Sequence, residues 1–286
     1  MAVKTYTDLY ALISALAGVS DFTTSEQTNI LAFANRRLYQ AYRTSPMWSR
    51  YIVGAQARPA SNNIIAESFT GISANITTAT RNGSTVTVVA SAAVDFVAGM
   101  YVTVAGLSGT VSPNGSYQVT EVDKTTVTDD TFTYDLVTTN TASETYTGSG
   151  TAIADTIPDI DSYSRIWGND PLDLNSAIEY EFYVSSDGAH VIGNNRALKG
   201  FWVGFTKAWD GPYTTASTSI PLEFFYYAAH SAYADFLKMD GQNDKGGIEE
   251  QVAQQFLMLE LEKAQHQRNN NALFRRISTY VSRSNR

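Results

Sequence analysis

The feature that most constrains the fold is a change of character in the middle of the chain. Residues 70–155 contain 20 threonines, no tryptophan and no histidine, and short runs such as 84–89 and 131–134 alternate between apolar and polar residues. A period of two is typical of a β-strand that buries one face. Turn residues, among them Asn114-Gly115, separate these runs at a spacing of about ten residues. We therefore expect residues 70–155 to be an inserted all-β sandwich whose two ends lie close together.

The segments on either side of this insert have the period of amphipathic helices. Thr5 and Gly18 are placed to begin and end a first helix, and Thr23-Thr24-Ser25-Glu26 fits a capping box that begins a second helix, which Pro46 stops. Pro221 is placed to begin a third helix. The last helix is expected to carry Ile248, Val252, Phe256 and Leu259 on one apolar face.

A small β element is predicted between the insert and the last helices. Residues 178–184 and 189–192 flank Asp187-Gly188, which predicts a hairpin, and residues 201–206 are expected to form its next strand. The expected fold class is therefore α+β. A discontinuous helical core covers 1–69 and 156–286 and carries a small β-hairpin or sheet element, and a β-sandwich is inserted at 70–155.

Composition excludes several classes of function. The chain has no cysteine, which removes disulfides, thiolate catalysis and thiolate metal sites. Its net charge of -8 disfavours a grip on duplex DNA, because phosphate affinity comes from clustered lysine and arginine. We find no apolar h-region near Met1 and no window that approaches the length of a membrane span, so we expect neither a signal peptide nor a membrane helix.

Candidate catalytic and metal-binding groups have simpler interpretations. Glu179 and Glu181 share one strand face, about 6.5–7 Å apart, but a glycosidase pair normally faces across a cleft. Asp123, Asp129 and Asp130 lack the ligand pattern of a calcium loop. We expect no enzyme, no metal and no cofactor. The three histidines, which lack the spacing of metal ligands, are His190, His230 and His266.

The segment 267–286 differs from the rest of the chain. It contains five arginines and no acidic residue, and apolar residues such as Leu273 and Phe274 interrupt it. Such a segment cannot form its own core, but its apolar residues can order it on a partner. The alternative interpretation is a solvated charged tail.

Several motifs outside the insert resemble those of head-to-tail adaptor (connector) proteins of tailed bacteriophages. They are Phe33-Ala34-Asn35-Arg36-Arg37-Leu38 through Pro46-Met47-Trp48, Ala208-Trp209-Asp210-Gly211-Pro212-Tyr213, Ile220-Pro221-Leu222-Glu223-Phe224, and Ala232-Tyr233-Ala234-Asp235-Phe236-Leu237. Separately, 75–150 resembles an immunoglobulin-like module found in phage structural proteins, through its Thr/Val strands, Pro113-Asn114-Gly115 and Tyr146-Thr147-Gly148-Ser149-Gly150.

The adaptor resemblance implies a virion structural protein at the head–tail junction, assembled in the host cytoplasm. It implies a ring of twelve copies that binds the portal above and a tail, nozzle or tail-completion protein below, while DNA passes through without specific binding. The insert is expected to contact a tail fibre. Open alternatives are a tail-completion or stopper protein, and a fibre-associated adhesin whose β module binds host glycan. A tail-associated hydrolase using Glu179 or Glu181 is not expected.

The same resemblance assigns contacts to named side chains. The C-terminal segment would dock on the portal through Arg268, Phe274, Arg275, Arg276, Ile277, Tyr280, Val281 and Arg283. Contacts between neighbouring subunits would involve Arg36, Arg37, Tyr42, Trp48, Tyr226, His230 and Tyr233.

Overall fold

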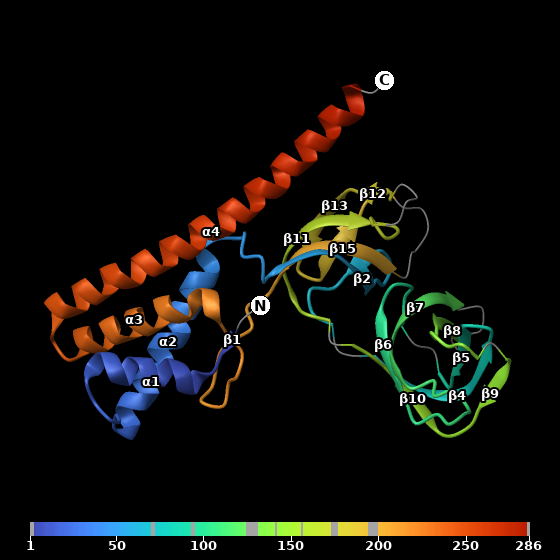
Figure 1. Cartoon of the computed structure of the whole chain (residues 1–286), viewed down its shortest axis with the longest axis horizontal. Helices are drawn as coiled ribbons and strands as arrows, with labels where there is room; N and C mark the ends of the chain where they lie inside the picture. Colours follow the sequence, from blue (N-terminus) through green and yellow to red (C-terminus); the bar gives the residue numbers. More distant parts are fainter. Residues whose placement is uncertain are drawn as a thin grey trace. The chain divides into compact units, whose positions relative to one another are not determined.

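The computed structural model describes residues 3–69, 72–92, 95–123, 131–140, 142–155, 157–172, 177–193 and 200–284, with side chains described as far as residue 266. The chain divides into two compact units. The helical unit comprises Met1–Ile52 and Trp209–Arg286, and the β unit comprises Val53–Ala208. The predicted α+β class is confirmed, with helices at both ends of the chain and strands between them (Figure 1).

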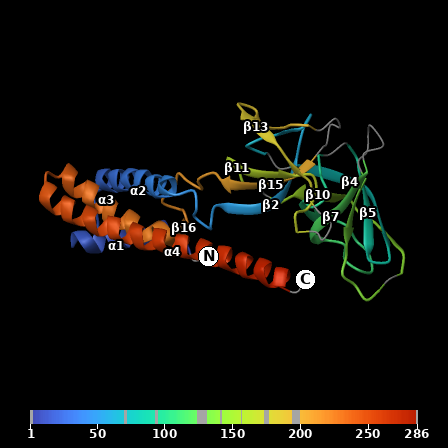
Figure 2. The same ribbon diagram turned by 90° about the horizontal axis from the view of Figure 1, so that it is seen from above.

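The described part of the helical unit contains four helices, and the predicted local signals mark both ends of the first and the start of the second. Thr5 and Thr23 each form a capping box, with Asp8 and Glu26 respectively, and Gly18 ends the first helix in the left-handed conformation at φ 69°. Helices α1 and α2 both pack on α3, and α4 runs beside α3 (Figure 2). The helices are α1 (Tyr6–Ala17), α2 (Thr24–Thr44), α3 (Leu222–Met239) and α4 (Asn243–Ser284), and β1 (Val3–Lys4) pairs with β16 (Ile220–Pro221).

An aromatic cluster forms much of the core of the helical unit. The chain turns back after α2, so that Trp48 donates a hydrogen bond from Nε1 to the carbonyl of Ala41 at 3.0 Å. The Trp48 ring meets that of Phe224 edge to face, with centroids 4.9 Å apart. Tyr51 packs against Tyr42 at 4.8 Å in the same manner. These contacts join the end of α2 to the start of α3.

The inserted β segment is a closed barrel, so the predicted immunoglobulin-like sandwich is wrong. Six antiparallel strands follow one another in the order β10-β6-β7-β8-β5-β4, and β10 then pairs with β4 to close the ring. Ser73 lies opposite Ile153, which places the two ends of the barrel side by side. The strands are β4 (Ser73–Asn82), β5 (Thr85–Ala90), β6 (Tyr101–Ala105), β7 (Gly115–Asp123), β8 (Thr131–Asp135) and β10 (Gly150–Ala154), and β9 (Glu144–Tyr146) pairs with the far end of β4.

The inward side of the barrel is filled by apolar side chains and one arginine. Val88 and Phe132 are fully buried, while the intervening threonines face outward. Arg81 is only 1% exposed. It pairs with Glu144 at 3.2 Å and donates to the hydroxyl of Tyr146 at 3.1 Å, which ties β4 to β9.

Two smaller sheets group with the barrel in the β unit and not with the helices, while the barrel strands themselves run from Ser73 to Ala154. The predicted hairpin is confirmed, because β13 (Phe182–Ser185) pairs with β14 (Gly188–Val191). Its expected neighbour is wrong, since β15 (Gly200–Lys207) pairs with β11 (Ile160–Trp167) instead. The two sheet orders are β12 (Glu179–Tyr180)-β11-β15-β2 (Ile52–Pro59) and β13-β14-β3 (Ile64–Ile65).

Candidate functional site

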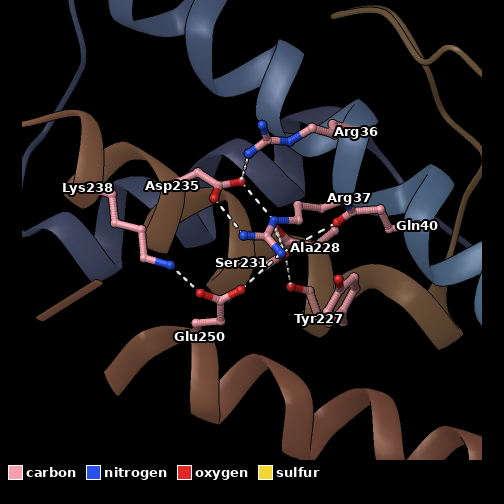
Figure 3. A network of polar contacts seen from close by, with 9 residues as sticks. All are labelled: Arg36, Arg37, Gln40, Tyr227, Ala228, Ser231, Asp235, Lys238 and Glu250. Atoms are coloured by element: carbon pink, nitrogen blue, oxygen red, sulfur yellow. Dashed lines mark hydrogen bonds and ion pairs between the residues drawn. The ribbon is translucent and has the colours of Figure 1, made fainter. Parts of the chain in front are cut away.

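A network of buried charges holds three helices of the helical unit together (Figure 3). Arg37 of α2 donates two hydrogen bonds to Asp235 of α3, at 2.8 and 2.6 Å, and a third to Glu250 of α4 at 3.2 Å. Lys238 also pairs with Glu250. Arg36 contacts Asp235 at 2.6 Å from a side chain that is 55% exposed, whereas the Asp235 side chain is 7% exposed. One carboxylate therefore orders two arginines from α2.

The electrostatics of this network favour its ionised form. Burial alone would raise the pKa of Asp235, but hydrogen bonds from Arg37 and Arg36 outweigh it and lower that pKa. The pKa of Glu250 is lowered mainly by its hydrogen bond from Lys238. The hydrogen bond to Asp235 raises the pKa of Arg37. The network is consequently suited to fixing helix positions and not to transferring protons at neutral pH.

Helix α4 presents two different apolar faces, and the predicted one is not the buried one. Ala253 and Leu257 are buried, whereas Ile248 and Leu259 are each 62% exposed. Ile248 and Ala253 are five residues apart, which is about 140° around a helix of 3.6 residues per turn. The face predicted from the sequence is therefore exposed at Ile248 and Leu259, and the core is lined by the opposite flank of the helix, through Ala253 and Leu257.

The exposed apolar face of α4 continues onto α3. Tyr226, which is 45% exposed, stacks on Phe256 with centroids 5.4 Å apart. His230 also stacks on Phe256, at 5.2 Å, and its Nδ1 lies 2.8 Å from Oε2 of Glu249. Surface aromatic and aliphatic groups arranged in this way are typical of protein contacts. We call this surface the α3–α4 face, and it comprises Tyr226, His230, Ile248, Val252, Phe256 and Leu259.

The other predicted subunit-contact residues are divided between core and surface. Arg37, Tyr42 and Trp48 are buried within a single chain, so they contribute to its core and not to an exposed surface. Tyr233 is half-buried against that core. Arg36 remains exposed while it pairs with Asp235.

The predicted portal-docking residues lie beyond the described side chains. The backbone of α4 is helical through Ser284, where the sequence suggested a segment without structure of its own. The residues concerned, whose side chains lie outside the described residues, are Arg268, Phe274, Arg275, Arg276, Ile277, Tyr280, Val281 and Arg283.

A second candidate site is a cavity of about 620 Å³ in the β unit. Trp202 of β15 lies against Gly99, where any side chain would collide with the indole ring. Gln56 contributes a buried amide oxygen with no hydrogen-bond partner among the described residues. The carboxylate of Asp155 is held by Thr103 at 2.9 Å. Further lining side chains are Tyr101, Gln118 and Asp170.

The isolated polar groups singled out in the sequence do not gather into one site. Glu179 lies on β12 with Arg165 3.9 Å away. His190 accepts or donates one hydrogen bond with Asp187 at 2.7 Å. No group of three or more histidine, aspartate or glutamate side chains suitable for a metal occurs within the described ranges. Asp129 and Asp130 lie outside the described residues.

Sequence reasoning missed the central role of Asp235. A charged residue between Ala234 and Phe236 on a largely apolar helix was the available signal, because a buried carboxylate requires a cationic partner. No helix within the described part of the chain is long and apolar enough to cross a membrane. Comparison of the chain with protein-family models, with curated proteins and with solved structures gives no match.

Proposed function

We propose that this chain is a structural virion protein that forms a ring at the head–tail junction of a tailed phage. In this role it joins the portal to the tail and continues the DNA channel. The observation that carries the proposal is the α3–α4 face, which leaves large apolar side chains in water on an otherwise well-packed unit. The motifs of α2 and α3 that resemble those of adaptor proteins indicate which kind of assembly this face would join.

A ring explains why this face is unpaired in one chain. A heterologous contact buries one surface of each subunit against a different surface of the next, and the rotation closes when the ring is complete. Burial of the exposed parts of Ile248 and Leu259 would contribute roughly 25 cal/mol for each Å² of apolar surface. Association would thus remove from water the apolar side chains that are exposed in the isolated subunit.

Charge suits passage of DNA better than capture of it. The net charge of -8 disfavours binding of the phosphate backbone, so a channel through the ring would let DNA slide without binding. The arginine-rich segment 267–286 has the opposite sign and is assigned to the portal. We assign the lower face to a tail, nozzle or tail-completion protein, and contact with a tail fibre to the β unit.

The test is electron microscopy and mass photometry of the full chain, alone and mixed with the portal of the same phage. We expect a symmetric ring on the portal. The double variant Ile248→Asp/Leu259→Asp should weaken assembly by at least about tenfold, the scale of a lost interface anchor. Val137→Asp is the matched control, because Val137 is an exposed apolar residue of the β unit.

Three outcomes are informative. Failure of the unchanged chain to form rings with or without the portal contradicts the proposal. Equal assembly by the double variant and the control removes the α3–α4 face from the contact. Binding to a tail end but not to the portal would favour the stopper or tail-completion alternative.

A second candidate function is glycan binding by the β unit, favoured by the 620 Å³ cavity. This volume is within the range of about 300–1,000 Å³ found for small-ligand sites. The sequence argued against a sugar site because residues 70–155 lack tryptophan, but Trp202 reaches the barrel from β15. Screening the full chain against immobilised glycans, with Trp202→Ala and Trp209→Ala compared, tests it. Absence of binding, or equal binding by both variants, would reject this candidate.

A further inference from the structure

A second, smaller cavity lies within the helical unit. It has a volume of about 230 Å³ and borders three segments: residues 48–51, the first turn of α3, and residues 260–264 of α4. Trp48, Tyr51 and Phe224 are among the residues that border it, and each is almost fully buried. This volume is below the range of about 300–1,000 Å³ that is usual for small-molecule sites. The cavity is therefore of the size for one inserted side chain.

The charges around this cavity are paired, with one exception. Lys263 pairs with Glu260 at 3.1 Å, and Arg50 lies 3.6 Å from Asp210. Glu223 is different, because its Oε2 is buried and has no hydrogen-bond partner among the described residues. A carboxylate oxygen removed from water without a partner costs free energy that a bound donor would recover.

The position of Glu223 in the fold is compatible with a negative charge. It lies in the first turn of α3, where the helix dipole favours a negative charge. The hydroxyl of Tyr51, another residue that borders the cavity, is buried too and makes no hydrogen bond of normal geometry with a described residue. Burial raises the pKa of Tyr51, so this hydroxyl stays neutral and cannot balance the carboxylate.

A guanidinium group fits these features better than other side chains. Its planar fork can donate two hydrogen bonds to one carboxylate. A lysine ammonium is a compact point charge without this paired geometry, and residues 267–286 contain no lysine. The chemistry of the cavity thus selects arginine.

The chain itself offers a source of such arginines. Residues 267–286 carry five arginines and no acidic residue, whereas the whole chain has a net charge of -8. Helix α4 continues to Ser284 without a break, and Arg275 is eleven residues beyond Ala264. At 1.5 Å per residue its backbone lies about 16 Å farther along the helix, too far to turn back into the same cavity.

We propose that this cavity binds an arginine from the C-terminal segment of a second copy of the chain. The candidates are Arg275, Arg276, Arg283 and Arg286, and one guanidinium fills the cavity while the others remain available to the portal. The inference rests on the proposed ring, and it specifies one contact between neighbours that the α3–α4 face does not include.

The test compares two substitutions in the same cavity. Glu223→Gln removes the unpaired charge and keeps the side-chain size, and Glu260→Gln is the control because Glu260 already has Lys263 as its partner. Assembly of the full chain is followed by mass photometry over a dilution series. We expect Glu223→Gln to raise the concentration for half-assembly by at least about tenfold, the scale of a broken buried charge pair, and Glu260→Gln by less than about threefold.

A variant with all four candidate arginines changed to glutamine leaves the cavity and the described core untouched. It should weaken assembly to a similar extent, and adding Glu223→Gln to it should have little further effect, because both changes remove one contact. Circular dichroism checks that Glu223→Gln retains its fold.

The outcomes separate this inference from the proposed function. If the unchanged chain forms rings and the two glutamate variants behave alike, the cavity contact is wrong and the ring stands. If Glu223→Gln weakens portal binding but not self-association, the arginine comes from the portal and the second-copy proposal fails. If the unchanged chain never assembles, both proposals fail together.

Discussion

The barrel and the helical unit differ in how much unpaired strand edge and apolar surface they leave exposed to water. In the barrel, pairing of β10 with β4 leaves the six-stranded ring without an open edge, and inward apolar residues alternate with outward threonines. The helical unit leaves the α3–α4 face exposed although its interior is well filled. A closed barrel is complete within one chain, whereas a helix with two apolar faces requires a second surface.

The buried ion pairs of the two units also differ in which elements they connect. In the barrel, Arg81 and Glu144 connect adjacent strands of one sheet. In the helical unit, Arg37 of α2 pairs with Asp235 of α3 and Glu250 of α4, which lie 198 and 213 positions later in the chain. The comparison indicates that the buried charges of the barrel tie neighbouring strands, whereas those of the helical unit set the positions of three helices.

The strongest test of this comparison is Asp235→Ala. It leaves Arg37 buried without its main partner, so we expect a loss of about 3–5 kcal/mol in the free energy of unfolding of the helical unit. Arg36→Ala is the control, because Arg36 is largely exposed and its pair should contribute at most about 1 kcal/mol. Hydrogen exchange followed by mass spectrometry reports the two units separately. Equal effects of the two variants would show that burial of the pair does not matter.

Acid should destabilise the helical unit, by less than Asp235→Ala does. The pKa values of Asp235 and Glu250 are lowered in the folded chain, so their contribution is present above the unfolded values of about 3.9 and 4.3. It is lost as the pH falls through the folded values. A neutral carboxyl group can still accept some hydrogen bonds, which limits the loss. Tyrosine fluorescence and hydrogen exchange between pH 6 and about 2.5 would measure it, and unchanged protection of the helical unit over this range contradicts the expectation.

The smallest expected effect is in the barrel, at Gly106→Ala. Gly106 has φ +82°, and an added Cβ would lie 2.7 Å from the carbonyl oxygen of Ser149. We expect a loss of about 1–3 kcal/mol in the β unit and no change in the helical unit. Gly83→Ala is matched to it, with φ +66° and open space around the added atom, and should cost about 1 kcal/mol. Thermal denaturation ranks the two, and an equal cost would mean that the backbone angle alone matters.

Local chemistry in the sequence was sufficient to predict the helix ends and the existence of the inserted β segment. Thr5, Gly18 and Thr23 act on backbone groups within a few residues, and the alternation of threonine and valine is a property of each strand by itself. For this reason these predictions needed no knowledge of distant contacts.

Only the tertiary structure decided between a barrel and a sandwich, and between the two faces of α4. Both β folds bury one side of each strand, so the choice depended on the long-range pairing of Ser73 with Ile153. On α4, the large residues Ile248 and Leu259 suggested the core by hydrophobicity, but close packing against α3 uses Ala253 and Leu257. Asp235 shows the same dependence, because its role comes from Arg37, which lies 198 positions away in the chain. The sequence alone determined the local elements. Side-chain packing and ion pairs between distant residues, which exist only after folding, determined which faces of those elements are buried and which stay exposed.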